Sequence, residues 1–138
     1  RQSFTNALKN QGLSVKYEYG ISHEDMCELF SRSKISLNFS KNMTLTPPRR
    51  QIKARLFEVT AGNSLLCTET TPGLEEYYNI DEEVVTFSSP LELYSKCEYL
   101  LKNENVLKRI SQNGFERFKK EHESKQRLPK ILDKIMSI

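Results

Sequence analysis

With 138 residues, the chain has the length of one domain that can bury a core of its own. Its 37% hydrophobic and 28% charged residues are typical of a water-soluble domain, and no apolar run approaches the roughly 18 residues of a membrane span. A net charge of +3 is too small to indicate nucleic acid as a main partner. We therefore expect a domain with no nucleic-acid partner and no stable membrane insertion.

The cysteine pattern argues against a metal or disulfide framework. Cys27, Cys67 and Cys97 lie far apart, and no two of them have the C-x-x-C spacing of a zinc or redox site. Reduced thiols predict a cytoplasmic location, and we expect no metal site. Since the chain begins with Arg rather than Met, we expect a single domain over residues 1–138 that is a piece of a longer protein.

Strands and helices are expected to alternate along the chain. Short apolar or alternating runs predict strands at 15–19, 35–39, 65–67 and 84–87. Helical spacing predicts helices at 3–10, 22–33, 50–61 and 73–78, and three more that begin near residues 90, 105 and 124. Gly62 is expected to end the third helix in the left-handed conformation. This order predicts the α/β class, with a small parallel sheet of about four strands flanked by helices.

A run of cations follows the second predicted strand. Ligands of open parallel sheets bind beyond the carboxyl ends of the strands. There, a polar loop is expected to lead into a helix that carries Arg49, Arg50 and Lys53 in its first turn and Arg55 shortly after. Because the helix dipole disfavours cations at an N-terminus, their presence predicts a bound diphosphate. A solvated helix end is the alternative interpretation.

Glu58 lies eight residues after Arg50, roughly 12 Å along a helix. A carboxylate there can accept hydrogen bonds from the two ribose hydroxyls of a nucleotide whose phosphates meet Arg50. An i,i+3 surface ion pair between Arg55 and Glu58 is the alternative. Gly20 and Ile21 end the first predicted strand, where we expect the base, whereas both histidines, His23 and His122, are expected to be structural.

Several segments together resemble a known family. Tyr19–Met26 is similar to its strand-Gly-x-Ser-x-Glu segment, and Ser33–Ser40 looks like its next strand. Arg55–Glu58, followed by Ala61 and Gly62, resembles its Arg-x-Phe-Glu-x-x-Ala-x-Gly segment. Over about residues 14–127 the chain thus resembles the C-terminal, nucleotide-sugar-binding half of GT-B glycosyltransferases, in the glycosyl transferases group 1 or CgeB-like family.

This resemblance implies a Rossmann-like half of a GT-B fold whose C-terminal helices cross back. It also implies a nucleotide-diphosphate sugar as donor substrate, no other cofactor, and an N-terminal domain that binds an unknown acceptor. Without that domain the isolated chain is expected to be inactive. The sequence has no Asp-x-Asp, which agrees with the metal-independent chemistry of this class.

Individual roles follow from the same resemblance. The superfamily uses two glutamates that lie eight residues apart, and the second of them binds ribose. Glu58 matches this second glutamate. Arg50 occupies the position of the first. Arg50 and Arg55 are the candidates to stabilise the departing diphosphate, because a guanidinium can bind two phosphate oxygens. Arg49 and Lys53 are expected to bind the nucleotide together with Glu58, Gly20 and Ile21.

Two other classes of function compete with donor binding. A catalytically inactive Rossmann-like interaction or regulatory module is favoured by Arg50 at a glutamate position and by the lack of the partner domain. A receiver-type signalling domain requires paired acids after the first strand and an Asp after a middle strand. Neither is present in this sequence.

Overall fold

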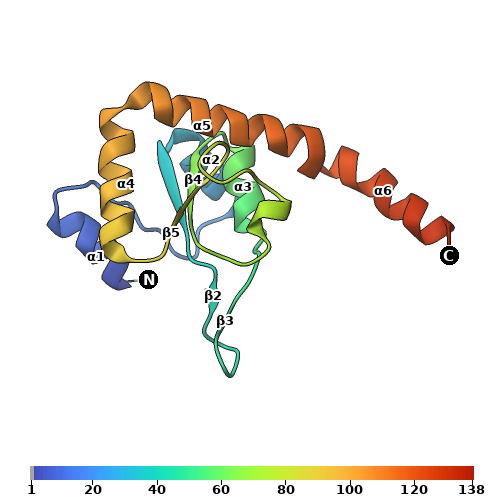
Figure 1. The fold of residues 1–138 in the computed structure, drawn as a ribbon, viewed down its shortest axis with the longest axis horizontal. Helices are drawn as coiled ribbons and strands as arrows, with labels where there is room; N and C mark the ends of the chain where they lie inside the picture. Colours follow the sequence, from blue (N-terminus) through green and yellow to red (C-terminus); the bar gives the residue numbers. More distant parts are fainter. Residues whose placement is uncertain (1) are drawn as a thin grey trace.

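A parallel sheet of three strands forms the centre of the molecule (Figure 1). The computed structural model describes residues 2–138. The strands are β1 (Ile35–Asn38), β4 (Leu65–Glu69) and β5 (Val85–Phe87), in the order β1-β4-β5. Ile35 pairs with Leu65 and Cys67 with Val85 in parallel register, so the three carboxyl ends share one edge. The predicted α/β class with a parallel sheet is confirmed.

Helices cover both faces of this sheet, which is why all five residues of β4 are buried. On one face α1 (Gln2–Asn10), α4 (Pro90–Lys102) and α5 (Glu104–Arg117) pack against Leu65, Cys67 and their neighbours. On the other face α2 (His23–Arg32), α3 (Arg55–Ala61) and the short 3-10 helix η1 (Leu74–Glu76) pack around Leu66. Alternating residues of β4 thus serve two separate hydrophobic clusters.

The predicted strand at 15–19 is wrong, because this segment is a loop that pairs with no strand of the sheet. Only Leu13 and Val15 reach the hydrophobic core. Tyr17 and Tyr19 are exposed, and Lys16 pairs with Glu18 at 3.3 Å. The apolar–polar alternation was therefore real, but too few of its side chains are buried to hold the segment against β1.

The helix expected at 50–61 begins only at Arg55. Arg49–Arg50 form β3, which pairs antiparallel with β2 (Lys41–Asn42), and the loop predicted at 40–49 is the hairpin between them. The backbone N–H of Gln51 also donates to the carbonyl of Ser40 at 3.1 Å. Arg49 and Arg50 have the extended backbone of a strand, so the helix does not start there, and the eight-residue helical spacing between Arg50 and Glu58 is wrong.

The end of α3 also differs from the expectation. Gly62 has φ −80°, and the left-handed residue is Asn63, with φ 58°. Gly62 has a packing reason instead: a Cβ there would lie 3.0 Å from the Cβ of Phe30 on α2. The glycine therefore allows α2 and α3 to approach each other.

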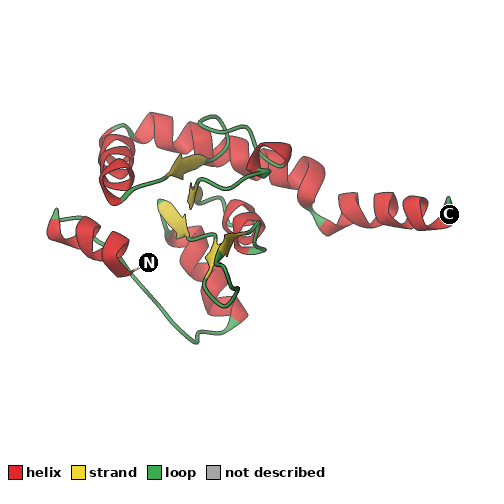
Figure 2. Cartoon of the chain, turned by 60° about the horizontal axis from the view of Figure 1, so that its bottom comes forward, coloured by secondary structure: helices red, strands yellow, loops and turns green. Residues whose placement is uncertain are grey.

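Helices make up the chain after β5. The Ser89 hydroxyl accepts a hydrogen bond from the Glu92 N–H at 3.2 Å and begins α4, as its Ser-Pro signal predicts. The helix α5 then runs back across the sheet and continues through the π-helical turn η2 (Phe118–His122) into α6 (Ser124–Met136). Figures 1 and 2 show α6 extending away from the body. No helix within residues 2–138 is both long and apolar enough to cross a bilayer.

Candidate functional site

Polar residues gather where the three parallel strands end. The Asn38 amide donates to the Thr68 hydroxyl at 2.9 Å, which links the ends of β1 and β4. Thr70 and Ser88, which follow β4 and β5, are joined by a hydroxyl–hydroxyl hydrogen bond of 2.9 Å. Because side chains from all three strand ends meet at this edge, it is the position where an open parallel sheet binds a ligand.

A buried carboxylate, Glu69, organises this edge. It ends β4 and is only 7% exposed. Its Oε2 accepts from the Ser40 hydroxyl at 3.3 Å and from the Lys41 backbone N–H at 3.1 Å, and its Oε1 lies 3.5 Å from Arg50 Nη1. Glu69 therefore fixes both strands of the β2–β3 hairpin to the sheet.

The cations expected at a helix start are thus carried by the hairpin and the segment after it. Arg50 is paired with Glu69, and its side chain remains 37% exposed. Arg49 is its exposed neighbour on β3 and points to the opposite side of the hairpin, as alternate strand residues do. Lys53 Nζ donates to the Phe39 carbonyl at 2.7 Å, which ties the segment before α3 to the end of β1.

Arg55 and Glu58 form an ion pair on α3, with Nε and Oε2 3.1 Å apart. The pair is partly exposed, with 47% of the Arg55 side chain and 32% of the Glu58 side chain accessible. Arg55 also stacks on Phe30, its guanidinium carbon 5.3 Å from the ring centroid. The surface pair considered from the sequence is therefore present. It holds one oxygen of Glu58, and within residues 2–138 the other accepts no hydrogen bond.

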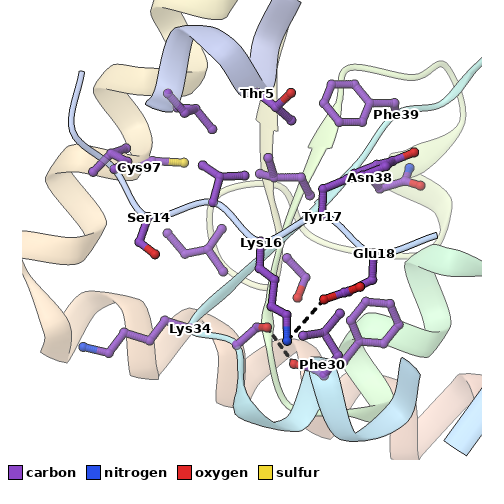
Figure 3. Close-up of a pocket in the computed structure, with 18 of the residues that line it drawn as sticks. Thr5, Ser14, Lys16, Tyr17, Glu18, Phe30, Lys34, Asn38, Phe39 and Cys97 are labelled. Atoms are coloured by element: carbon purple, nitrogen blue, oxygen red, sulfur yellow. Dashed lines mark hydrogen bonds and ion pairs between the residues drawn. The ribbon is translucent and has the colours of Figure 1, made fainter. Parts of the chain in front are cut away.

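A cavity of about 560 Å³ lies between the loop at 13–18 and the open edge of β1 (Figure 3). Its volume is within the range of small-molecule sites. Lys53 and Arg55 line it together with Asn38 and Phe39, whereas Leu8 and Cys97 belong to its apolar part. Arg49, Arg50, Glu58, Gly20 and Ile21 are not among its lining residues.

Gly20 and Ile21 lie just before α2. Gly20 has φ +68°, a conformation that favours glycine, and Ile21 is 36% exposed. The next residue, Ser22, caps α2 by accepting from the Asp25 N–H at 3.1 Å. Within residues 2–138 no hydrogen bond joins Gly20 or Ile21 to Glu58 or to the cationic segment, and their part in base binding stays a prediction.

The histidines occupy different settings. His23 is exposed, with its Nε2 3.6 Å from Cys27 Sγ one helical turn away. His122 shares a hydrogen bond of 2.8 Å with the Tyr77 carbonyl, and its ring packs on Phe57 and Tyr78. Burial lowers the pKa of His122 below its ordinary value. A neutral imidazole packed among aromatic rings agrees with the structural role expected for His122.

The sequence-based site omitted Glu69. The available signal was a carboxylate that ends a short apolar strand at the ligand-binding edge, since Leu65, Leu66 and Cys67 directly precede Thr68 and Glu69. Its importance depends on the hairpin, however, and the sequence predicted a helix in place of the second hairpin strand. Within the described chain, no three His, Cys, Asp or Glu side chains come together as a metal site.

Comparison with known proteins agrees with this architecture. Residues 5–133 match the family model described as "Glycosyl transferase-like", and the chain belongs to that family. Among solved structures it resembles the C-terminal domain of a glycosyl transferase group 1 family protein, LpcC, from Francisella tularensis, with a TM-score of 0.67 and 13% identity. No match was found among curated proteins.

The structural likeness covers 89% of this chain and 62% of the solved one, so this chain accounts for less than two thirds of that protein domain's length. At 13% identity the likeness shows the fold alone. Together with the family match, it confirms the resemblance seen in the sequence at the level of fold and family: the chain has a Rossmann-like α/β fold and belongs to the glycosyl transferase-like family.

Proposed function

We propose that this domain binds a nucleotide-diphosphate sugar at the carboxyl edge of its sheet and holds the donor for glycosyl transfer. The observation that carries the proposal is the position of Glu58. Its carboxylate is partly exposed and is held from one side by Arg55, so it can accept hydrogen bonds from a ribose diol. The acceptor and the acceptor-binding domain would come from another part of a longer protein.

The cations have a chemical role in this proposal. Glycosyl transfer leaves negative charge on the departing diphosphate, and cations placed in advance stabilise that charge. Within residues 2–138 the ion pair with Glu69 engages only Nη1 of Arg50, so the rest of its guanidinium can meet phosphate oxygens. Arg55, Lys53 and Arg49 lie close by in the sequence, and Lys53 and Arg55 line the cavity beside β1. In this scheme the side chains neutralise the diphosphate without a metal ion.

The second candidate is an inactive interaction module. It is favoured by the Arg50–Glu69 ion pair, in which a buried carboxylate already neutralises the arginine that replaces the family's first glutamate. In such a module the hairpin would be a rigid surface feature, and nucleotides would not bind.

Replacing Glu58 with glutamine tests the proposal. The amide retains one acceptor oxygen but loses the charge, so we expect about tenfold weaker binding of the preferred nucleoside diphosphate by calorimetry. Glu98→Gln is the matched control, because Glu98 forms a comparable exposed ion pair with Lys102 on α4, at 3.0 Å. Equal affinities of the Glu58 and Glu98 variants would show that Glu58 does not bind ribose.

A further inference from the structure

Two of the three cysteines meet inside the body of the domain. Cys67 lies on β4, and Cys97 lies on α4, which packs against that face of the sheet. Both side chains belong to one hydrophobic cluster, are at most 2% exposed, and share a hydrogen bond between their thiols. The fold thus places two free thiols in contact, although they come from elements that are far apart in the sequence.

One of the two thiols can be reached through the cavity beside β1. Of the cysteines in residues 2–138, only Cys97 lines this cavity of about 560 Å³. Figure 3 shows the Cys97 sulfur pointing from α4 into the space between the loop at 13–18 and β1. A molecule as small as hydrogen peroxide can therefore approach Cys97 from the cavity, while Cys67, at 0% exposure, stays enclosed by its neighbours.

The contact makes the two thiols chemically unequal. Their hydrogen bond lowers the pKa of Cys97 and raises the pKa of Cys67 well above its ordinary value, and burial raises the pKa of Cys67 further. The thiolate is the form of cysteine that attacks an oxidant. The thiol that ionises more readily is therefore also the one that the cavity reaches, and its protonated neighbour is in contact with any product formed on it.

We propose that Cys97 and Cys67 form an oxidation-sensitive dithiol, in which Cys97 reacts with hydrogen peroxide from the cavity and Cys67 then closes a disulfide. First the Cys97 thiolate attacks one peroxide oxygen, the O–O bond breaks, and hydroxide leaves a sulfenic acid behind. Then the Cys67 sulfur attacks the Cys97 sulfur, the S–O bond breaks, and the Cys67 proton leaves with the hydroxide as water. The two thiols lose two electrons and two protons, and the peroxide is reduced to water. This modification goes beyond donor binding and does not rest on it.

Mass spectrometry of the Cys27→Ser variant tests this chemistry. Cys27 is the exposed cysteine, on α2, and its removal prevents disulfides between copies without touching the core. The folded variant is treated briefly with hydrogen peroxide, then unfolded and alkylated. We expect a mass loss of about 2 Da, no alkylated thiol, and a pair of peptides linked through Cys67 and Cys97. Dithiothreitol should restore both thiols to alkylation.

Two further changes on the Cys27→Ser background separate the steps. With Cys67→Ala, Cys97 should stop at the sulfenic acid, which dimedone traps, and with Cys97→Ala, Cys67 should remain a thiol. The linked peptides of the Cys27→Ser variant decide the question even if either core variant fails to fold. The proposal is overturned if both thiols of that variant stay alkylatable, if Cys97 is oxidised further without a disulfide, or if the disulfide forms only in urea.

Discussion

At the scale of single residues, Glu69 holds the cationic hairpin at the carboxyl edge of the sheet. It binds the hairpin through Ser40 and Lys41 and partly neutralises Arg50. Removing a buried hydrogen-bonded carboxylate leaves its donors unsatisfied, which generally costs more than the interaction contributes on balance. The Arg50–Glu69 ion pair also fixes the position of Arg50, so the stability of the hairpin and the position of the proposed phosphate ligand are linked.

Arg50→Ala is expected to weaken binding of a nucleoside diphosphate about tenfold while changing the affinity for the matching nucleoside little. The reason is that the guanidinium is proposed to meet phosphate and not base or ribose. Calorimetry with both ligands measures the difference, and Arg109→Ala on α5 is the exposed-arginine control. If both ligands lose affinity equally, Arg50 acts through the hairpin and not through phosphate.

Glu69→Gln addresses the structural half of the same contact. We expect a loss of about 1–3 kcal/mol in the free energy of unfolding, because Arg50 loses its charged partner and the hydrogen bonds of the hairpin weaken. Urea unfolding of the two single variants and the double variant with Arg50→Ala gives the coupling between the residues. Additive losses would mean that the 3.5 Å contact contributes nothing.

At the scale of elements, the crossing of α5 over the chain before β5 depends on one glycine. A Cβ at Gly114 would lie 2.5 Å from the Glu83 carbonyl oxygen. The clash is with backbone, which cannot move aside as the end of a flexible side chain can. A glycine inside a helix generally lowers the stability of the helix, whereas here Gly114 has a packing role.

Gly114→Ala should therefore destabilise the fold by about 1–3 kcal/mol, although alanine is the better helix former by about 1 kcal/mol. Ser95→Ala on the exposed side of α4 is the control and should be neutral or slightly stabilising. Chemical unfolding measures both variants. A stabilised Gly114 variant would mean that the crossing has room for a methyl group.

The π-helical turn η2 adds a pH dependence through His122. The groups around it are Arg117, Glu121 and Arg127, and burial is the main cause of its lowered pKa. A pKa that is lower in the folded state means that the unfolded chain binds the proton more readily. The contribution of neutral His122 to the free energy of unfolding is therefore fully present above about pH 6.5. It is lost as the pH falls through the pKa of His122 in the folded state.

His122→Gln should flatten the decrease in stability below about pH 6.5, since glutamine can still donate to the Tyr77 carbonyl but does not titrate. Thermal unfolding across pH 5 to 7 measures this change in pH dependence. His23→Gln, which removes an exposed histidine, is the control. An unchanged slope in the His122 variant would show that its burial does not affect folding in this range.

At the scale of the whole molecule, the α/β class, the three core strands and the C-terminal helices could be predicted because burial repeats along them in a regular pattern. Leu65–Cys67 and the Ser89–Pro90 start are examples. The segment at 15–19 shows the limit of this reasoning, since alternation does not reveal whether a neighbouring strand edge accepts the pairing.

The candidate site could be predicted only in part, for a related reason. Glu58 and Arg55 are identified by a local pattern on one helix, and the structure keeps them together. Arg49 and Arg50 were assigned to the wrong element, because hairpin pairing between 41–42 and 49–50 depends on contacts that helical spacing does not include. Glu69 is 28 residues away from the Lys41 N–H that it accepts, and no local pattern links the two.

The central claim, that this domain binds a nucleotide diphosphate, is tested most directly by thermal unfolding with UDP, GDP and ADP, each compared with its nucleoside. A ligand at about 100 times its dissociation constant adds roughly 2.7 kcal/mol to stability. The account predicts a clear rise in unfolding temperature with one diphosphate and a much smaller rise with its nucleoside. No shift with any diphosphate, in this chain and in a longer protein that includes the acceptor domain, would contradict it.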